Sequence, residues 1–573
     1  MAQEFDLVVR HGTIIDGTGS APFQADIAIS GNRISAIGSG LPGGVEEVDA
    51  AGCIVTPGFV DVHTHYDGQV MWEQRLKPSS NHGVTTAVMG NCGVGFAPAR
   101  ACNRDLMIRL MEGVEDIPQV VMAQGLPWNW ESFPEYLDAL SERQCDMDFA
   151  AQLPHSPLRV HVMGEKGASM EAANDEELAE MRRLTADAIR AGALGVSSSR
   201  NIFHRFRDGK PAPSVHTEEK ELMALAAGLR DAGDGVFQIN PNLEADAERE
   251  LALFGRLAKV SGRPLNFSLF VLPHDDKAWP AYVDGIESAR KAGMQINGQF
   301  LPRPPGVLFG LDLSLNPFSL NPSYRAIEDL PLPEKVTRLR DPELRRRLLQ
   351  ERPEDPNPSL ISFVSNPSWK LYALAEPARY SFEAEESLSA RAAREGRDLR
   401  ELIYDALLED EGHAILCAYS NDVRGYLDHT LPRIGAEGTI VALGDGGAHY
   451  SLICDAAYTT YALGELVDRE ELDLSKLVRA LTSQPAASVG LFDRGTIAVG
   501  TKADINVIDR DNIVLHRPTV SRDLPSNGKR LSQKASGYRA TIVSGEVTYR
   551  DGQATGALPG RLVRAGAAAM SAQ

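Results

Sequence analysis

The sequence predicts an α/β fold: a (β/α)8 TIM-like barrel with a small β-sandwich domain formed from both chain ends. Two observations carry this prediction. Strand-like and helix-like segments alternate through the middle of the chain, as such a barrel requires. Both ends are instead rich in short strands and turns. The 573 residues are also enough for a large core and for more than one domain.

The two ends of the chain share one pattern. Residues 5–54 alternate β-branched runs with glycine and asparagine turns, which is typical of antiparallel hairpins. Residues 495–508 and 538–549 repeat it. We therefore expect one discontinuous β-domain, built from residues 1–55 plus 490–565, and a barrel at residues 56–489.

The middle of the chain shows helical and strand periods in turn. Apolar residues recur at helical spacing over residues 176–191 and 221–230, and a short apolar run follows each of these segments. We expect barrel strands at residues 84–89, 193–197, 235–239, 264–270, 293–298 and 438–446.

One insertion interrupts the barrel pattern. Residues 302–358 are rich in proline and then in charge, with an arginine-rich helix expected at residues 342–352. A long irregular insertion in a compact domain is often a lid or a binding loop. A solvated surface excursion is the alternative.

The composition restricts the possible partners. A net charge of −20 argues against nucleic acid and anionic membranes, because both would be repelled. The six cysteines have no paired spacing, which favours a reducing compartment. No run of about 18 apolar residues occurs. We expect a soluble cytoplasmic protein that acts on a small molecule, with a homo-oligomer left possible.

Two histidines stand at the end of an apolar strand. His63 and His65 follow the β-rich run of residues 53–62. Side chains at i and i+2 on a strand point the same way, so both imidazoles can reach one metal ion. Barrels carry their chemistry at the carboxyl ends of their strands. The pattern predicts a metal site, and packing or hydrogen-bonding histidines are the alternative.

With its flanks, this stretch resembles the first barrel strand of the amidohydrolase superfamily. The resemblance runs through most of the chain and is closest to the N-acyl-D-amino-acid deacylase (D-aminoacylase) branch. Residues 485–504 are similar to the passage by which amidohydrolases leave the barrel for the β-domain. The resemblance implies a metal-dependent hydrolase acting on carbon–nitrogen bonds other than peptide bonds.

Two further metal ligands follow from the resemblance. Asp445 comes after the last predicted strand, where the superfamily has an aspartate that touches the metal and acts as the general base. Cys92 lies in Gly-Asn-Cys-Gly, as in the D-aminoacylase branch, and a thiolate suits zinc. The alternatives are an ordinary Asp-Gly turn and a cysteine that acts as a small apolar residue.

The chain departs from that branch at two places. Asn240 and Asn242 stand where the branch has a histidine and an arginine, and Leu269 and Val271 stand where it has a histidine and a lysine. We therefore expect one divalent metal ion, zinc by preference, held by four residues. These ligands are His63, His65, Cys92 and Asp445. Asn240 is left as a weak oxygen ligand or a hydrogen-bond donor to substrate.

The lost arginine and lysine also bear on the substrate. Both are suited to binding a carboxylate, so we expect an uncharged amide rather than a free N-acyl-D-amino acid. Arg303 could restore the positive charge from another direction. We expect His155 and Arg159, in a segment that resembles the family's third strand, and His449 after Asp445 to contact the substrate or support the site.

These observations predict a metal-dependent hydrolase that cleaves an amide of a small molecule through activated water. A lactone or a cyclic imide could be opened by the same machinery. A barrel without a metal that serves as an interaction scaffold is the alternative from another class of protein.

Overall fold

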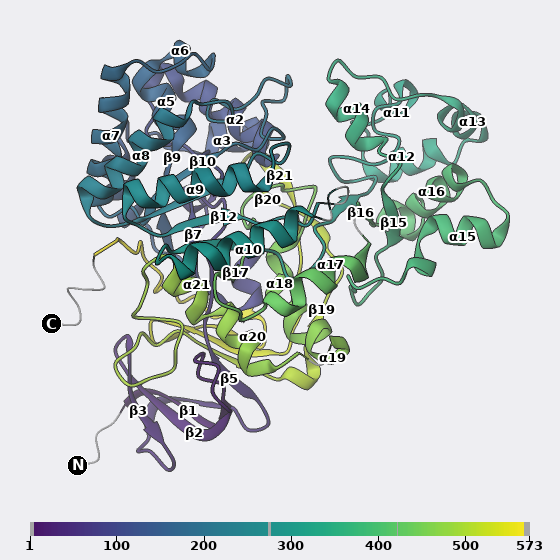
Figure 1. The fold of residues 1–573 in the computed structure, drawn as a ribbon. Coiled ribbons are helices and arrows are strands. Elements are labelled where there is room, and N and C mark those ends of the chain that lie inside the picture. Colours follow the sequence, from purple (N-terminus) through teal and green to yellow (C-terminus); the bar gives the residue numbers. More distant parts are fainter. Residues whose placement is uncertain (1–4, 273–274, 276, 421, 471, 567–573) are drawn as a thin grey trace.

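A computed structural model describes residues 5–272, 275, 277–420, 422–470 and 472–566. Figure 1 shows a central α/β region, a β-rich part beside the N-terminus, and a mainly helical lobe that stands apart on one side. The mixed α/β architecture predicted from the sequence is confirmed.

Parallel strands form the centre of the α/β region. One sheet contains β6 (Phe59–Asp61), β7 (Val84–Met89) and β8 (Asp148–Ala151). A second contains β9 (Leu153–Pro154), β10 (Gly195–Ser199), β11 (Val236–Asn240), β12 (Leu265–Ser268), β13 (Ile296–Phe300) and β17 (Thr439–Val441). Only Gln152 separates β8 from β9, so the two sheets follow one another in chain order.

Backbone hydrogen bonds also join the segments that follow the last and the first strands of this series. The amide of Asp445, after β17, donates to the carbonyl of His63, after β6, over 3.2 Å, and the amide of His65 donates to Gly446 over 2.8 Å. The segments that follow β6 and β17 therefore lie side by side, although they are far apart in sequence.

Amphipathic helices pack against these strands. Asn174 caps α7 through a reciprocal bond with Glu177, and Met181 and Ile189 on one side of that helix are buried. Figure 1 shows α7 to α10 arranged along one side of the strands. The principal helices of this region are α2 (Arg104–Glu115), α3 (Gln119–Gly125), α4 (Phe133–Ser141), α5 (His155–Met163), α7 (Asp175–Arg190), α8 (Glu219–Ala232), α9 (Ala247–Ser261), α10 (Ala278–Lys291), α17 (Val423–Thr430), α20 (Leu474–Leu481) and α21 (Ser483–Ser488). Across the described part of the chain, no helix combines the length and apolarity needed to cross a membrane.

Both chain ends enter one nine-stranded sheet. Its strands are β1 (Phe5–Ile14), β2 (Phe23–Ser30), β3 (Arg33–Gly38), β4 (Gly44–Asp49), β5 (Ile54–Pro57), β18 (Ile505–Ile508), β23 (Tyr538–Val543), β24 (Glu546–Arg550) and β25 (Gln553–Ala554). β5 pairs in parallel with β1 and antiparallel with β18, where Val55 faces Val507. Buried aliphatic residues from both ends share one core. This is the meeting of chain ends that a discontinuous domain requires.

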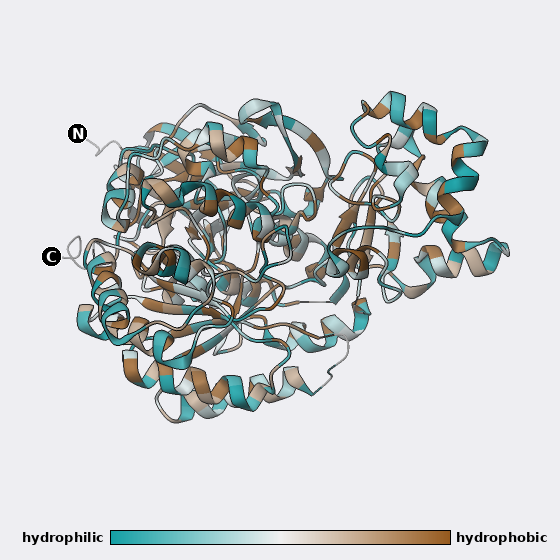
Figure 2. Cartoon of the chain, turned by 90° about the horizontal axis from the view of Figure 1, so that it is seen from above, coloured by the Kyte–Doolittle hydropathy of each residue, from teal (hydrophilic) through white to brown (hydrophobic). Residues whose placement is uncertain are grey.

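The lobe has its own small core. The lobe consists of an antiparallel sheet and six α-helices. The strands are β14 (Val307–Phe309), β15 (Lys370–Ala373) and β16 (Leu416–Tyr419), and the helices are α11 (Pro322–Arg325), α12 (Leu332–Leu339), α13 (Pro342–Gln350), α14 (Pro358–Val364), α15 (Leu388–Glu395) and α16 (Leu399–Leu407). Leu344 and Leu348 of α13 share that core with Leu402 and Leu407 of α16, so the packed unit continues beyond residue 358. Figure 2 shows the lobe beside the main body, with mostly hydrophilic residues along its outer helices.

A buried ion cluster connects the parallel strands to the nine-stranded sheet. Asp148 of β8 accepts a hydrogen bond from Arg494 over 2.7 Å and lies 3.0 Å from the ammonium of Lys502. Lys502 also contacts Asp504, which precedes β18, over 2.6 Å. Burial tends to raise the pKa of Asp148, but Lys502 and Arg494 outweigh it and hold that pKa at about 2. The cluster therefore stabilises the junction with Asp148 ionised.

We expect Asp148→Asn to lower the free energy of unfolding by about 3–5 kcal/mol at pH 7, because it leaves two buried cations short of a partner. Since the pKa of Asp148 is depressed by folding, its contribution is present above about pH 4 and is lost as the pH falls toward 2. Urea unfolding at a series of pH values should show the two proteins converging in acid.

The matched control is Asp138→Asn. Asp138 pairs with Arg564 at the surface, where 74% of its side chain is exposed, and its loss should cost less than about 1 kcal/mol. Equal losses in the two variants would contradict a structural role for the buried cluster.

Candidate active site

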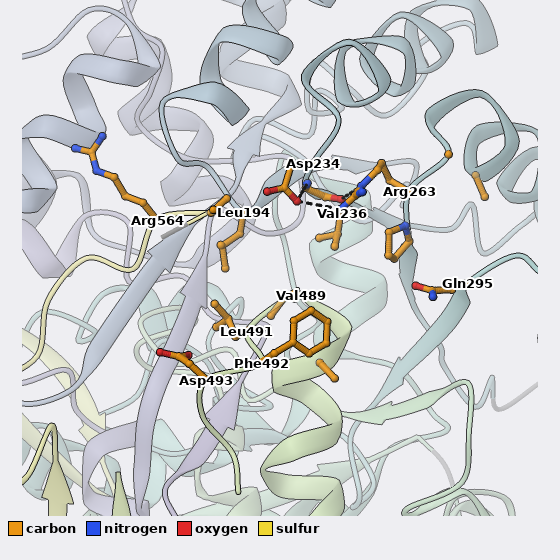
Figure 3. A pocket seen from close by; sticks show the side chains of 18 of the residues that line it. Leu194, Asp234, Val236, Arg263, Gln295, Val489, Leu491, Phe492, Asp493 and Arg564 are labelled. Atoms are coloured by element: carbon orange, nitrogen blue, oxygen red, sulfur yellow. Dashed lines mark hydrogen bonds and ion pairs between the residues drawn. The ribbon is translucent and has the colours of Figure 1, made fainter. Parts of the chain in front are cut away.

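A large cavity lies away from the residues singled out in the sequence. It has a volume of about 980 Å³ and is bordered by Val236, at the amino end of β11, by Leu194 and by the segment from Val489 to Asp493. Figure 3 shows Asp234 and Arg263 paired on its wall. None of its described lining residues is a histidine or a cysteine. It therefore offers no chemistry comparable to that of the predicted metal ligands.

A smaller cavity, about 190 Å³, lies at the carboxyl ends of the strands. His63 and His65 reach it just after β6, Asn240 at the end of β11, and Asp445 just after β17. Its described lining residues are His63, His65, Cys92, Glu115, His204, Asn240, Ser268, Leu269, Phe270, Leu301, Pro305, Tyr426, Leu443, Asp445, His449 and Asp455. Five residues of the predicted site thus meet in one cavity: the four metal ligands and Asn240. His449 is a sixth.

The four predicted ligands form a compact cluster. The ligand atoms of His63, His65 and Cys92 lie within 4.8 Å of one another. Nε2 of His63 is 3.2 Å from the sulfur of Cys92. Oδ1 of Asp445 is 3.6 Å from Nε2 of both histidines and has no hydrogen-bond partner in the described part of the chain. Two imidazoles, a thiol and a carboxylate are a donor set that zinc binds.

Burial disfavours charge on every member of this cluster. It lowers the pKa of His63 to about 4 and that of His65 to about 3, and it raises the pKa values of Cys92 and Asp445. The imidazoles are therefore neutral at pH 7, as metal ligands must be. A divalent cation would offset the cost of ionising the thiol and the carboxylate, because its own charge dominates such a site. The residues present fit a metal ion.

Strained backbone accompanies the cavity. Cys92, Leu443, Asp445 and His449 line it, and all four have left-handed φ angles, of 57°, 66°, 47° and 48°. Such angles are uncommon outside glycine and cost on the order of 1–3 kcal/mol each. Strain of this kind persists where the surroundings fix a side chain in place, which is consistent with a functional site.

Asn240 holds the sulfur of Cys92. Its Nδ2 donates to that sulfur over 3.2 Å. Its Oδ1 accepts from Ser268 over 2.5 Å and from Gln238 over 3.3 Å. Because the amide oxygen is engaged by these two donors, the contacts favour the hydrogen-bond donor role over the weak oxygen ligand. Leu269, the other departure from the branch pattern, lines the cavity as an apolar wall.

His155 and Arg159 are not among the described residues that line the cavity. Both bind the buried carboxylate of Glu221, His155 over 2.8 Å, and His155 also bonds Ser198 of β10 over 2.9 Å. Of the two predicted roles, these contacts fit support of the strands around the site rather than substrate contact.

Arg303 is buried behind the cavity wall and likewise does not line it. It donates to the carbonyl of Cys454 over 3.0 Å and to the carboxylate of Asp455, and its guanidinium stacks 3.8 Å from the centre of the Tyr380 ring. It therefore does not present a positive charge to the cavity in place of the missing arginine and lysine.

Two further lining residues were not among the predicted site residues. Glu115 is the last residue of α2, and His204 lies in the loop after β10. Glu115 is buried, with Oε1 3.4 Å from Nδ1 of His65 and Oε2 3.5 Å from Nε2 of His449. Neither residue stands at a motif spacing, so only the packed structure reveals that they reach the cavity.

The fold agrees with the comparison to known proteins. The model of the amidohydrolase family matches residues 46–549, and the chain belongs to that family. It is 36% identical to D-aminoacylase of Alcaligenes xylosoxydans xylosoxydans over 274 residues, which are 46% of this chain and 52% of the relative. This match thus spans about half of the relative's length. The predicted resemblance to the D-aminoacylase branch is confirmed, and with it a hydrolase at the level of the family.

Two longer matches extend the comparison. N-acyl-D-glutamate deacylase of the same organism is 27% identical over 522 residues, which are 90% of this chain and 89% of the relative. The structure of N-acyl-D-glutamate deacylase from Bordetella bronchiseptica, in complex with zinc and a phosphonate inhibitor, superposes with a TM-score of 0.65 at 23% identity. That superposition covers 98% of this chain and all of the other, and it shows a common fold.

We expect Glu221→Ala to lower the free energy of unfolding by about 3–5 kcal/mol, because it leaves Arg159 and His155 buried without their carboxylate. Metal content per folded chain should not change, since neither partner lines the cavity. Urea unfolding and elemental analysis measure the two effects. Loss of metal in a variant of unchanged stability would instead place His155 and Arg159 in the site.

Proposed function

We propose that this protein is a metal-dependent hydrolase that cleaves the amide bond of an uncharged small molecule. The observation that carries the proposal is the meeting of His63, His65, Cys92 and Asp445 in one buried cavity at the carboxyl ends of the parallel strands. We also infer that the nine parallel strands, with β8 and β9 counted as one position, close into a (β/α)8 barrel. The hydrogen bonds between the segments after β6 and β17 support this closure.

These four residues would hold one divalent ion, with zinc as the expected metal because two imidazoles and a thiolate are present. When bound, such an ion polarises a carbonyl and lowers the pKa of water to roughly 7. Asn240 and Leu269 stand where the branch has two histidines, and they do not replace them as ligands. The amide of Asn240 is engaged by Cys92, and Leu269 is apolar.

Asp445 is the proposed general base and acid. Its Oδ1 faces the cluster with no hydrogen-bond partner among the described residues, so this oxygen is available to take a proton from water. Burial raises the pKa of Asp445, which favours holding that proton and delivering it to the leaving nitrogen. The apolar walls at Leu269, Phe270 and Leu301 limit competing water.

The charges around the cavity indicate the substrate. Among its described lining residues there is no lysine or arginine, whereas Glu115, Asp445 and Asp455 all carry carboxyl groups. A free carboxylate on the substrate would lack a partner there and would be repelled. An uncharged amide suits this surface better. A lactone or a cyclic imide would meet the same groups, while the clustering of four ligands argues against a scaffold without a metal.

The first test is metal content, measured by elemental mass spectrometry on protein purified without added metal. We expect about one divalent ion per chain, and none in a folded His63→Ala/His65→Ala double variant. Two ions per chain would contradict the single site. A folded wild-type protein that takes up no metal even on reconstitution would rule out the hydrolase and favour the scaffold.

The second test compares substrates that differ only in charge, such as N-acetyl-D-leucine and its primary amide. We expect kcat/KM for release of acetate to be at least about tenfold higher for the amide derivative, which corresponds to about 1.4 kcal/mol in the transition state. A matched lactone measures the alternative reaction. If the free acid is turned over far better, the preference for an uncharged substrate is contradicted, whereas the proposal of a hydrolase is not.

A further inference from the structure

Two buried atoms without hydrogen-bond partners face each other beside the metal cluster. Nδ1 of His65 and Oε1 of Glu115 each lack a partner within the described part of the chain, and they are 3.4 Å apart. Both side chains are almost completely buried, at 1% and 2% exposure. Leaving such groups unpaired is costly, so a small shortening of this distance satisfies both at once.

A hydrogen bond here would determine how His65 binds a metal. With its proton on Nδ1 and directed at Glu115, the imidazole keeps the lone pair of Nε2 free. Nε2 is the atom that lies 3.6 Å from Asp445 in the cluster. A carboxylate behind a histidine fixes the tautomer, orients the ring and makes the nitrogen a stronger ligand.

His63 shows the same arrangement with a different acceptor. Its Nδ1 is 2.9 Å from Oε1 of Gln299 on β13, and its Nε2 faces Cys92. Both histidines therefore turn Nε2 toward the cluster and Nδ1 toward a side-chain oxygen. The acceptor for His63 is a neutral amide, whereas the acceptor for His65 is a carboxyl group.

Glu115 also connects His65 to the loop that carries Asp445. Its Oε2 is 3.5 Å from Nε2 of His449, and the backbone amide of His449 donates to the carbonyl oxygen of Glu115. The end of α2 is thus tied to two sides of the cavity. This placement explains why a glutamate is buried there although no lysine or arginine in the described part of the chain pairs with it.

We propose that Glu115 is the positioning residue of the metal site: it orients His65 so that Nε2 binds the ion. The inference rests on the proposed function, because it requires that His63, His65, Cys92 and Asp445 hold a metal. Glu115 acts through His65 and is not itself a ligand.

The test measures zinc affinity by competition with a chromophoric chelator, on protein first stripped of metal. Glu115→Ala should weaken zinc binding about 10- to 100-fold. Glu115→Gln should fall between the wild type and Glu115→Ala, because the amide oxygen still accepts from Nδ1. The visible spectrum of the cobalt-loaded protein should change in Glu115→Ala, which a general loss of stability would not produce.

The matched control is Asp116→Asn. Asp116 is the next residue, its carboxylate accepts from Ser314 rather than from His65, and asparagine tolerates its left-handed φ of 52°. Zinc affinity in this variant should stay within about twofold of the wild type. Circular dichroism confirms folding in each case, and Glu115→Gln decides the question if Glu115→Ala does not fold.

Two results would overturn the inference. Wild-type zinc affinity and an unchanged cobalt spectrum in folded Glu115→Ala, or in Glu115→Gln if only that variant folds, would show that His65 needs no support from Glu115. Equal weakening by Asp116→Asn would show that the end of α2 matters only for folding. A wild-type protein that binds no zinc would instead contradict the proposed function itself. This outcome is distinct from the other two.

Discussion

The candidate site is built around one electrostatic constraint: acidic side chains are buried where the described chain supplies no cation to balance them. Cys92 and Asp445 face two neutral histidines, and burial opposes ionisation of both acidic groups. A cation bound within the cluster would remove that opposition. The other features of the site serve this requirement, since Asn240 holds the sulfur, Gln299 and Glu115 stand behind the histidines, and left-handed backbone aims the loops inward.

Contacts elsewhere in the molecule hold the residues of the cluster in fixed positions. The first and last parallel strands are joined by the backbone bonds around His63 and Asp445, so the two ends of the ligand set share one hydrogen-bonded segment. At the other side, the ions around Asp148 fasten β8 to the nine-stranded sheet. Distances in the cluster are therefore determined by contacts between residues that are hundreds of positions apart in the chain.

The parts predicted from the sequence are those with a local signal. Strand alternation placed His63 and His65 together, and motif resemblance added Cys92 and Asp445. Glu115 and His204 could not be found in this way, because a helix end and a loop approach the cavity only through tertiary packing. For a similar reason, the insertion predicted at residues 302–358 is shorter than the lobe in the structure. Its strands are short and pair over long separations, as Leu308 does with Cys417, and a proline-rich composition gives no sign of such pairing.

The nine-stranded sheet also has a consequence for biosynthesis. β5 leads directly into β6 and the histidines, yet one of its two neighbours, β18, lies about 450 residues later in the chain. During synthesis from the N-terminus, that edge of β5 stays open until β18 has been made. The end of α2 with Glu115 and the loop with Cys92 are made early, whereas β5, just before β6 and His63, gains its partner β18 much later. The pairing of β5 with β18 can therefore form only after all the parallel strands between them in the chain have been synthesised.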